Sequence, residues 1–276
     1  MGLYKYGVCE WVLPVRGPEA IVMASNIGFD GIQITEAGGH DAGFPLLREE
    51  VQDEYKRAVS ETNIEIQALH LWTLCRLASM IHPVKSEAGR FATYCIKAGL
   101  EVCEALSIPE LNLTSGFMSQ IKHAADFTIF GDHLKLACEM AESKGVKIVF
   151  ESALYAEEIL KMHDYVGENL KVCYDLFNPI RFNMDSPIEE IRVLGKAGVI
   201  DHFHVKDGPV NCIGCSLLGE GIGNYNESMN EISKLNYSGW LMTENYYVDM
   251  ERVYDKSVIQ LAEIDLETMK RYGGDV

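Results

Sequence analysis

The sequence lacks any apolar run of the roughly 20 residues that a helix needs to cross a bilayer. It also lacks the apolar core of a secretory signal, because Lys5 and a strand-like run follow Met1 within a few residues. We therefore expect a soluble, cytoplasmic protein that has no membrane partner.

Basic residues are scarce. The chain has 24 Lys and Arg against 41 Asp and Glu, which gives a formal net charge of -17. A surface with this excess of negative charge repels the phosphate backbone of DNA or RNA over most of its area. The composition therefore argues against nucleic acid as a partner.

Linkers and low-complexity blocks are also missing, so we expect one domain that spans residues 1–276. With 276 residues, 47% of them hydrophobic, the chain is long enough to bury one large core. The segment after Trp11 reads VLPVRGP, which is not the glycine pattern of a dinucleotide-binding open sheet. Its absence favours a closed barrel over a doubly wound sheet.

Cysteine is present eight times, but no two C-x-x-C pairs occur together as a structural zinc site requires. In a chain of this length without a secretory signal, we expect the thiols to stay reduced. The pair Cys212 and Cys215 lies in a Gly-rich loop, and we interpret it as plain loop thiols. Five others lie in apolar periodic runs and are expected in the core: Cys9, Cys95, Cys103, Cys138 and Cys173.

What the sequence does contain is a regular alternation of strand-like and helix-like segments. About eight strand–helix units emerge, the number that closes a parallel barrel, so we expect an α/β fold of the (β/α)8 TIM-barrel type. The expected strands are 4–11, 31–36, 64–72, 109–113, 146–150, 170–174, 200–206 and 239–243. The expected helices are 19–28, 45–62, 85–106, 126–144, 155–166, one from 187, 226–235 and 250–272.

The segment 200–207, IDHFHVKD, is the most informative of these strands. Side chains alternate along a strand, so His202, His204 and Lys206 share one side and Phe203 and Val205 the other. Buried histidines and a lysine inside a barrel require polar partners. A bound metal ion is one way to supply them.

Four consecutive strands end in an ionisable group: Glu151 in KIVFES, Asp175 in KVCYDL, His204 in DHFHVK and Glu244 in LMTENY. Active sites of such barrels lie at the carboxyl ends of the strands. Three carboxylates gathered there would repel one another unless a cation neutralised them, and this set without thiolate suits Mn²⁺, Mg²⁺ or Co²⁺. Taken singly, each carboxylate is also a plausible helix cap, and His204 is a plausible core histidine.

The segments FES, YDLFN, HFHVKD, LGEG and GWLMTEN resemble those of the sugar phosphate isomerase/epimerase family of xylose-isomerase-like TIM barrels, which includes ketose 3-epimerases and inosose dehydratases. The resemblance implies a divalent metal, Mn²⁺ first, held by Glu151, Asp175, His204 and Glu244. It also implies that Glu151 and Glu244 act as acid and base.

The sequence departs from the free-ketose 3-epimerases at two places. They carry a histidine three residues after the aspartate and an arginine six residues after the ligand histidine, where this chain has Asn178 and Val210. The pattern is more similar to the branch that contains phosphorylated pentulose 3-epimerases. Lys206 or Arg181 could bind a phosphate locally, and whether the substrate is phosphorylated stays open.

Other polar residues near expected strand ends are candidates for binding substrate. They are Trp11, Glu36, His70, Asn112, Asn178 and Lys206, with Glu10, His40 and Trp72 as further candidates. His70 could equally be a buried histidine bonded to backbone, and the tryptophans could simply pack. We expect Lys206 and Asp207 to pair with one another. The glycines of LGEG and its surroundings are a weak signal for a phosphate cradle.

The leading hypothesis is a metal-dependent enzyme that epimerises or isomerises a keto sugar, or its phosphate, through an enediolate. A lyase that uses the same site on a keto sugar or a 3-keto glycoside is the first alternative, and a sugar-binding barrel without turnover is the second. A nucleic-acid lesion enzyme is disfavoured by the charge. The expected partner is a small carbohydrate, and a homo-oligomer is compatible with the resemblance.

Overall fold

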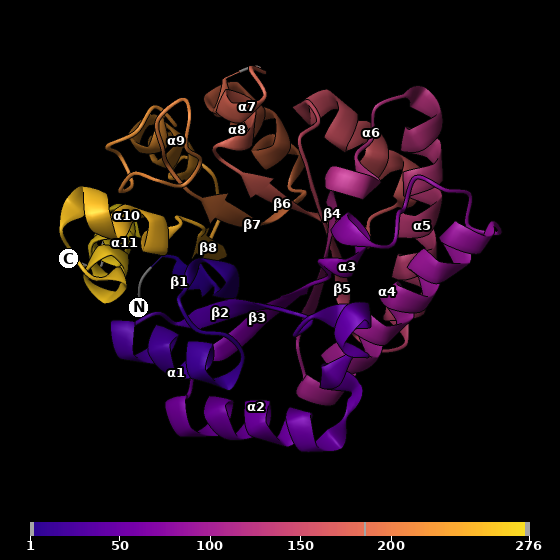
Figure 1. The fold of residues 1–276 in the computed structure, drawn as a ribbon. Coiled ribbons are helices and arrows are strands. Elements are labelled where there is room, and N and C mark those ends of the chain that lie inside the picture. Colours follow the sequence, from indigo (N-terminus) through magenta and orange to yellow (C-terminus); the bar gives the residue numbers. More distant parts are fainter. Residues whose placement is uncertain (1–2, 185, 274–276) are drawn as a thin grey trace. The chain divides into compact units, whose positions relative to one another are not determined.

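The computed structural model describes residues 3–184 and 186–273, in which eight parallel strands alternate with helices (Figure 1). The strands follow one another around a closed barrel in chain order, as the sequence predicts. They are β1 Lys5–Cys9, β2 Gly31–Thr35, β3 Glu65–His70, β4 Glu110–Ser115, β5 Lys147–Ser152, β6 Leu170–Asp175, β7 Ile200–Val205 and β8 Trp240–Thr243.

Most strand residues are buried on both faces, which is typical of parallel sheets covered by helices. Short β-branched and aromatic stretches such as IVF in β5 and FHV in β7 meet this requirement without alternation. Within the described residues, no helix has both the length and the apolar character to cross a membrane.

The chain forms two compact units. The first comprises 1–33, 58–65 and 174–276. Its ladder joins β8 to β1 and β1 to β2 on one side and β7 to β8 on the other. Helices α8 and α9 contact each other, and α11 packs on α10, α1 and β1. Its helices are η1 Glu10–Val12, α1 Pro18–Ile27, α7 Asn178–Arg181, α8 Pro187–Ala197, α9 Tyr225–Ile232, α10 Tyr247–Tyr254 and α11 Val258–Gly273.

The second unit comprises 34–57 and 66–173. Its ladder joins β3 to β4, β4 to β5 and β5 to β6, and α5 contacts α4, α6 and β5 (Figure 1). Ser86 begins α4 by accepting a hydrogen bond from the Gly89 N–H at 3.0 Å. The helices are η2 Gly39–Ala42, η3 Pro45–Leu47, α2 Glu49–Thr62, whose end belongs to the first unit, α3 Thr73–Arg76, α4 Glu87–Leu106, η4 Phe117–Ser119, α5 Ala124–Glu142 and α6 Ala156–Val166.

Two expected helices are wrong in part. The segment 250–272 forms two helices. Helix α10 ends because Asp255 adopts a left-handed conformation (φ 49°). Helix α11 then begins, and the Ser257 hydroxyl accepts the N–H of Gln260 in its first turn. The segment 45–62 begins as the short turn η3, and the α-helix starts only at Glu49. The expectation of a single domain over 1–276 stays a prediction.

The expectation for the loop cysteines is wrong. Cys212 and Cys215 form a disulfide, because the turn between them brings their Cα atoms to 5.6 Å, within the range that a disulfide can span. The five other cysteines named from the sequence, together with Cys75, are free and buried, as expected for core residues.

The close approach of strands at Gly31 yields a test of the fold. A Cβ atom at Gly31 would lie 2.9 Å from the Glu65 carbonyl oxygen and against the Trp240 ring, neither of which can move freely. We expect Gly31→Ala to lower the free energy of unfolding by about 1–3 kcal/mol, measured by urea denaturation. The control, Gly116→Ala, adds a Cβ whose nearest neighbour is 3.7 Å away and should stay within about 0.5 kcal/mol of the parent. Equal stabilities of the two variants would contradict this packing.

Candidate metal and acid–base site

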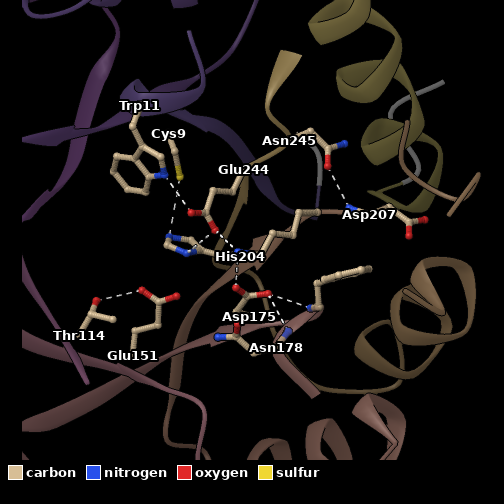
Figure 2. Close-up of polar contacts among 12 residues, drawn as sticks. Cys9, Trp11, Thr114, Glu151, Asp175, Asn178, His204, Asp207, Glu244 and Asn245 are labelled. Carbon is tan, nitrogen blue, oxygen red and sulfur yellow. Dashed lines mark hydrogen bonds and ion pairs between the residues drawn. The ribbon is translucent and has the colours of Figure 1, made fainter. Parts of the chain in front are cut away.

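In the first unit, the carboxyl ends of three neighbouring strands bring three ionisable side chains together. Asp175 is the last residue of β6, His204 lies one residue before the end of β7, and Glu244 follows β8 directly. Each offers a ligand atom within 4.8 Å of the others, and all three side chains are buried (Figure 2). The sequence predicted these positions from the strand ends.

Lys206 supplies the positive charge of this group. Its ammonium nitrogen lies 2.6 Å from Asp175 Oδ2 and 2.6 Å from Glu244 Oε2, and the residue is only 5% exposed. The expected pairing of Lys206 with Asp207 is therefore wrong. Successive side chains turn to opposite sides at the end of β7, so Lys206 faces the site while Asp207 faces the loop that follows.

Asp175 serves two purposes with its two oxygens. Oδ1 accepts the backbone N–H groups of Phe177 at 2.8 Å and Asn178 at 3.2 Å, where the short helix α7 begins. Oδ2 faces Lys206. The helix-start role and the site role considered for Asp175 are thus compatible. Asn178 is half-buried, and the contact it makes with Asp175 is through its backbone.

The orientation of His204 is set by Gln33 on β2. The Gln33 side-chain oxygen is only an acceptor, so the 2.8 Å contact with His204 Nε2 requires that this nitrogen carry the proton. Cys9 also donates to the same oxygen, at 3.6 Å. The other ring nitrogen, Nδ1, lies 3.6 Å from Glu244 Oε2. This places an imidazole ligand atom on the side of the carboxylates.

Glu244 is held by Trp11 as well as by Lys206. Trp11 lies in η1 and is half-buried, and its indole N–H donates to Glu244 Oε1 at 2.8 Å (Figure 2). Two residues beyond Glu244, burial and the Glu244 charge together raise the pKa of Tyr246 to about 12. The indole and the phenol therefore remain neutral hydrogen-bonding groups at neutral pH.

Glu151 lies in the second unit, near the end of β5, and is buried. It is in register with Thr114 of β4, whose hydroxyl donates to Glu151 Oε2 at 3.0 Å. Burial, and then the charges of Glu151 and Glu36, raise the pKa of the neighbouring Cys75 thiol to about 12. Glu151 is thus a carboxylate in a poorly solvated environment.

The second unit also contains three residues that the sequence suggested for substrate binding: His70, Glu36 and Asn112. His70 ends β3 and is buried, with its ring 5.8 Å from that of Trp72. Glu36 is bound within the protein, since it accepts the Trp72 N–H at 2.8 Å and the Thr73 hydroxyl at 2.7 Å. Asn112 is fully buried, but its predicted place at a strand end is wrong because β4 continues to Ser115.

Sequence reasoning missed Gln33, Thr114 and the partners of Asp207. A polar residue within an apolar strand, such as Gln33 in GIQIT, was an available signal for a buried hydrogen-bonding role. Thr114 was missed because β4 was expected to end at Leu113, two residues before its actual end at Ser115. The Asp207 carboxylate accepts the N–H groups of the glycines around LGEG, so this loop cradles a carboxylate of its own chain.

The donor set fits a divalent cation. Asp175 and Glu244 already share one buried cation, the Lys206 ammonium, and the His204 ring is oriented by its contact with Gln33, an outer-partner arrangement that is usual for metal-bound imidazole. Oxygen ligands with one imidazole suit Mn²⁺, Co²⁺ or Mg²⁺. A carboxylate next to such a cation can also exchange a proton with a bound molecule.

Comparison with known proteins agrees with this architecture. Residues 21–270 match the family described as Xylose isomerase-like TIM barrel. A 2-epi-5-epi-valiolone 7-phosphate 2-epimerase from Actinoplanes sp. is 27% identical over 230 residues, which cover 82% of this chain and 80% of the relative.

Solved structures show the same fold at lower identity. D-psicose 3-epimerase from Clostridium cellulolyticum H10, solved with D-tagatose, superposes with a TM-score of 0.76 over 99% of this chain and 100% of its own, at 17% identity. The IOLI protein, solved with a zinc atom, has a TM-score of 0.73 over 98% of each chain, at 15% identity.

The buried ion pairs of Lys206 predict a large effect of removing the ammonium. Lys206→Met leaves two buried carboxylates facing each other without a cation, and we expect it to lower the free energy of unfolding by about 3–5 kcal/mol in the presence of a chelator. Adding Glu244→Gln should recover part of the loss, because one of the charges is then absent. Urea denaturation measures both effects. The control Lys161→Met, on the exposed side of α6, should change little; wild-type stability of Lys206→Met would refute the pairing.

Asp265 of α11 predicts a pH dependence of stability. Burial raises its pKa to about 7, against the opposing effect of hydrogen bonds from Leu218, Asn245 and Tyr247. A carboxyl that holds its proton more tightly when folded stabilises the fold at low pH, and this contribution is lost as the pH rises from about 4 to 7. Stability should therefore fall over this range by up to about 1.4 kcal/mol per pH unit more in the parent than in Asp265→Asn. Asp255→Asn, an exposed control, should keep the parental slope, and identical slopes in all three proteins would contradict the raised pKa.

Proposed function

The chain belongs to the xylose isomerase-like TIM barrel family, and from this membership we propose that it is a divalent-metal-dependent epimerase of a keto sugar or its phosphate. The observation that carries the proposal is the buried group of Asp175, His204 and Glu244, whose ligand atoms lie within 4.8 Å of one another. The epimerase names of the sequence relative and of the psicose 3-epimerase structure support the reaction class.

We assign Glu151 as the fourth member of the site. It lies on β5, the strand that precedes β6 in the barrel order, and its carboxylate is buried near the strand end as those of Asp175 and Glu244 are. The four residues would hold Mn²⁺ in preference to softer metals, because three of the four ligands are carboxylates. Zn²⁺, present in the structure of the IOLI protein, is the alternative that metal analysis must separate.

A divalent cation held by these residues would supply Lewis acidity, which makes the C–H beside a bound carbonyl more acidic and offsets the negative charge that develops when the proton leaves. Glu151 and Glu244 move the proton: one removes it from the carbon and the other returns it from the opposite face. Trp11 and Lys206 each donate a hydrogen bond to one oxygen of Glu244, so its carboxylate is oriented. Thr114 orients Glu151 in the same way.

The relatives differ in whether the sugar carries a phosphate. The sequence relative acts on a 7-phosphate, whereas the psicose 3-epimerase was solved with a free ketose. The Lys206 ammonium already forms ion pairs with Asp175 and Glu244, so it is not available to bind a substrate phosphate. A panel should therefore pair each ketose with its phosphate, such as D-fructose with D-fructose 6-phosphate.

Proton exchange tests the proposed reaction. With Mn²⁺ in D₂O, the protein should place solvent deuterium on the carbon next to the carbonyl of one panel sugar and yield its epimer without loss of water or of an aglycone. Glu151→Gln and Glu244→Gln should each lower this rate by about 10²- to 10⁴-fold, because each removes one proton carrier. Mass spectrometry and NMR of the sugar measure both effects.

The control Glu49→Gln removes an exposed carboxylate from α2 and should leave the rate unchanged. Stoichiometric dehydration or cleavage would show a lyase instead. Tight sugar binding without any deuterium exchange would show a binding protein.

A further inference from the structure

We propose that Asp207 and Asn245 are positioning residues for the site, and that they hold Lys206 and Glu244 in the register that the reaction needs. The inference rests on the proposed function, since it concerns the same carboxylate. It arises from a pattern at the ends of β7 and β8, where each residue of the site is followed by a residue that points the other way.

The two strand ends are joined on both sides. On the site side, Lys206 Nζ donates to Glu244 Oε2 at 2.6 Å. On the other side, the backbone N–H of Asp207 donates to the Asn245 side-chain oxygen at 2.9 Å. Figure 2 shows Asn245 and Asp207 together, away from Trp11 and His204. The bond between them continues the ladder beyond its last pair, Val205 with Thr243.

Hydrogen bonds to both of its carboxylate oxygens fix the Asp207 side chain in place. Its carboxylate accepts four backbone N–H groups, and it is almost fully buried. A side chain at Gly221 or Gly223 would collide with this carboxylate, so the glycines are required by the anchor. Four backbone N–H groups that converge on one carboxylate fix its position and that of the loop around it. The donors are Gly208 at 2.9 Å, Gly219 at 3.0 Å, Gly221 at 3.0 Å and Gly223 at 2.8 Å.

Asn245 closes the network, and its amide is suited to this because it accepts and donates at once. Its oxygen accepts from Asp207, and its nitrogen donates to Asp265 Oδ2 at 2.7 Å. Asp265 Oδ1 accepts the N–H of Leu218, within the loop that wraps Asp207, at 2.8 Å. A carboxylate in place of Asn245 would face Asp265 with a lone pair instead of a donor.

The consequence for the site is geometric. Lys206 directly precedes Asp207 in the chain, and Glu244 directly precedes Asn245. A shift of either strand end therefore moves the Glu244 carboxylate relative to Asp175 and His204. A displacement of about 1 Å at a reacting group costs roughly 10²-fold in rate, and loss of an outer partner weakens metal binding by about 10- to 100-fold. A residue with only a structural role would change the melting temperature without changing either quantity in the folded protein.

Two nearly isosteric variants, Asn245→Asp and Asp207→Asn, test the proposal. Both are measured, and if one does not fold the other still provides the test. The first readout is the affinity of the full-length protein for Mn²⁺ alone, by calorimetry at a temperature where circular dichroism shows the variant folded. The second is the rate of deuterium exchange into the active panel sugar. We expect affinity to fall about 10-fold or more, and kcat to fall about 10- to 100-fold with KM changed by less than about threefold.

Glu220→Gln is the matched control, because Glu220 is an exposed carboxylate of the same loop whose side chain accepts a hydrogen bond from the Tyr254 hydroxyl at 2.9 Å. It should retain wild-type affinity and rate. If wild-type protein binds Mn²⁺ and exchanges the proton while both folded variants match it within twofold, the positioning proposal is overturned and the proposed function stands. If wild-type protein itself neither binds Mn²⁺ nor exchanges the proton, both fall together.

Discussion

Two buried carboxylates that share one cation are the constraint on which the site depends. Asp175 and Glu244 lie at the ends of β6 and β8, on either side of β7, and burying two carboxylates side by side is costly unless a positive charge lies beside them. Lys206 provides that charge from the strand between them. On the other side of the His204 ring, Gln33 fixes the orientation in which Nδ1 faces Glu244.

Because side chains alternate along a strand, successive residues at these strand ends face opposite sides and have different roles. At the end of β7, Lys206 faces the site and Asp207 faces the following loop, and at the end of β8, Glu244 and Asn245 repeat the arrangement. Residues that carry charge for chemistry therefore sit beside residues that fix the loops. The glycine-rich segment, which was only a weak signal for a phosphate cradle, donates its backbone N–H groups to the Asp207 carboxylate.

The sequence predicted the fold closely, because the strands are short, buried and separated by clear helical periods. It also placed Asp175, His204 and Glu244 at strand ends, where parallel order brings them together. It could not predict which partner Lys206 takes, because Asp207 is nearer in sequence while Asp175 and Glu244 are nearer in space. The Cys212–Cys215 disulfide and the break at Asp255 depend on local backbone conformations that composition does not determine. The assigned roles of Glu151 and of the substrate-binding candidates stay predictions.

We propose that Glu151, Asp175, His204 and Glu244 together hold one divalent ion. The most direct measurement is a crystal structure of protein grown with MnCl₂, with diffraction data collected on both sides of the manganese absorption edge. The account predicts a single anomalous peak within bonding distance of one atom from each of the four residues, lost on the low-energy side of the edge. An anomalous map without a peak there, or with manganese bound only at the surface, would contradict it.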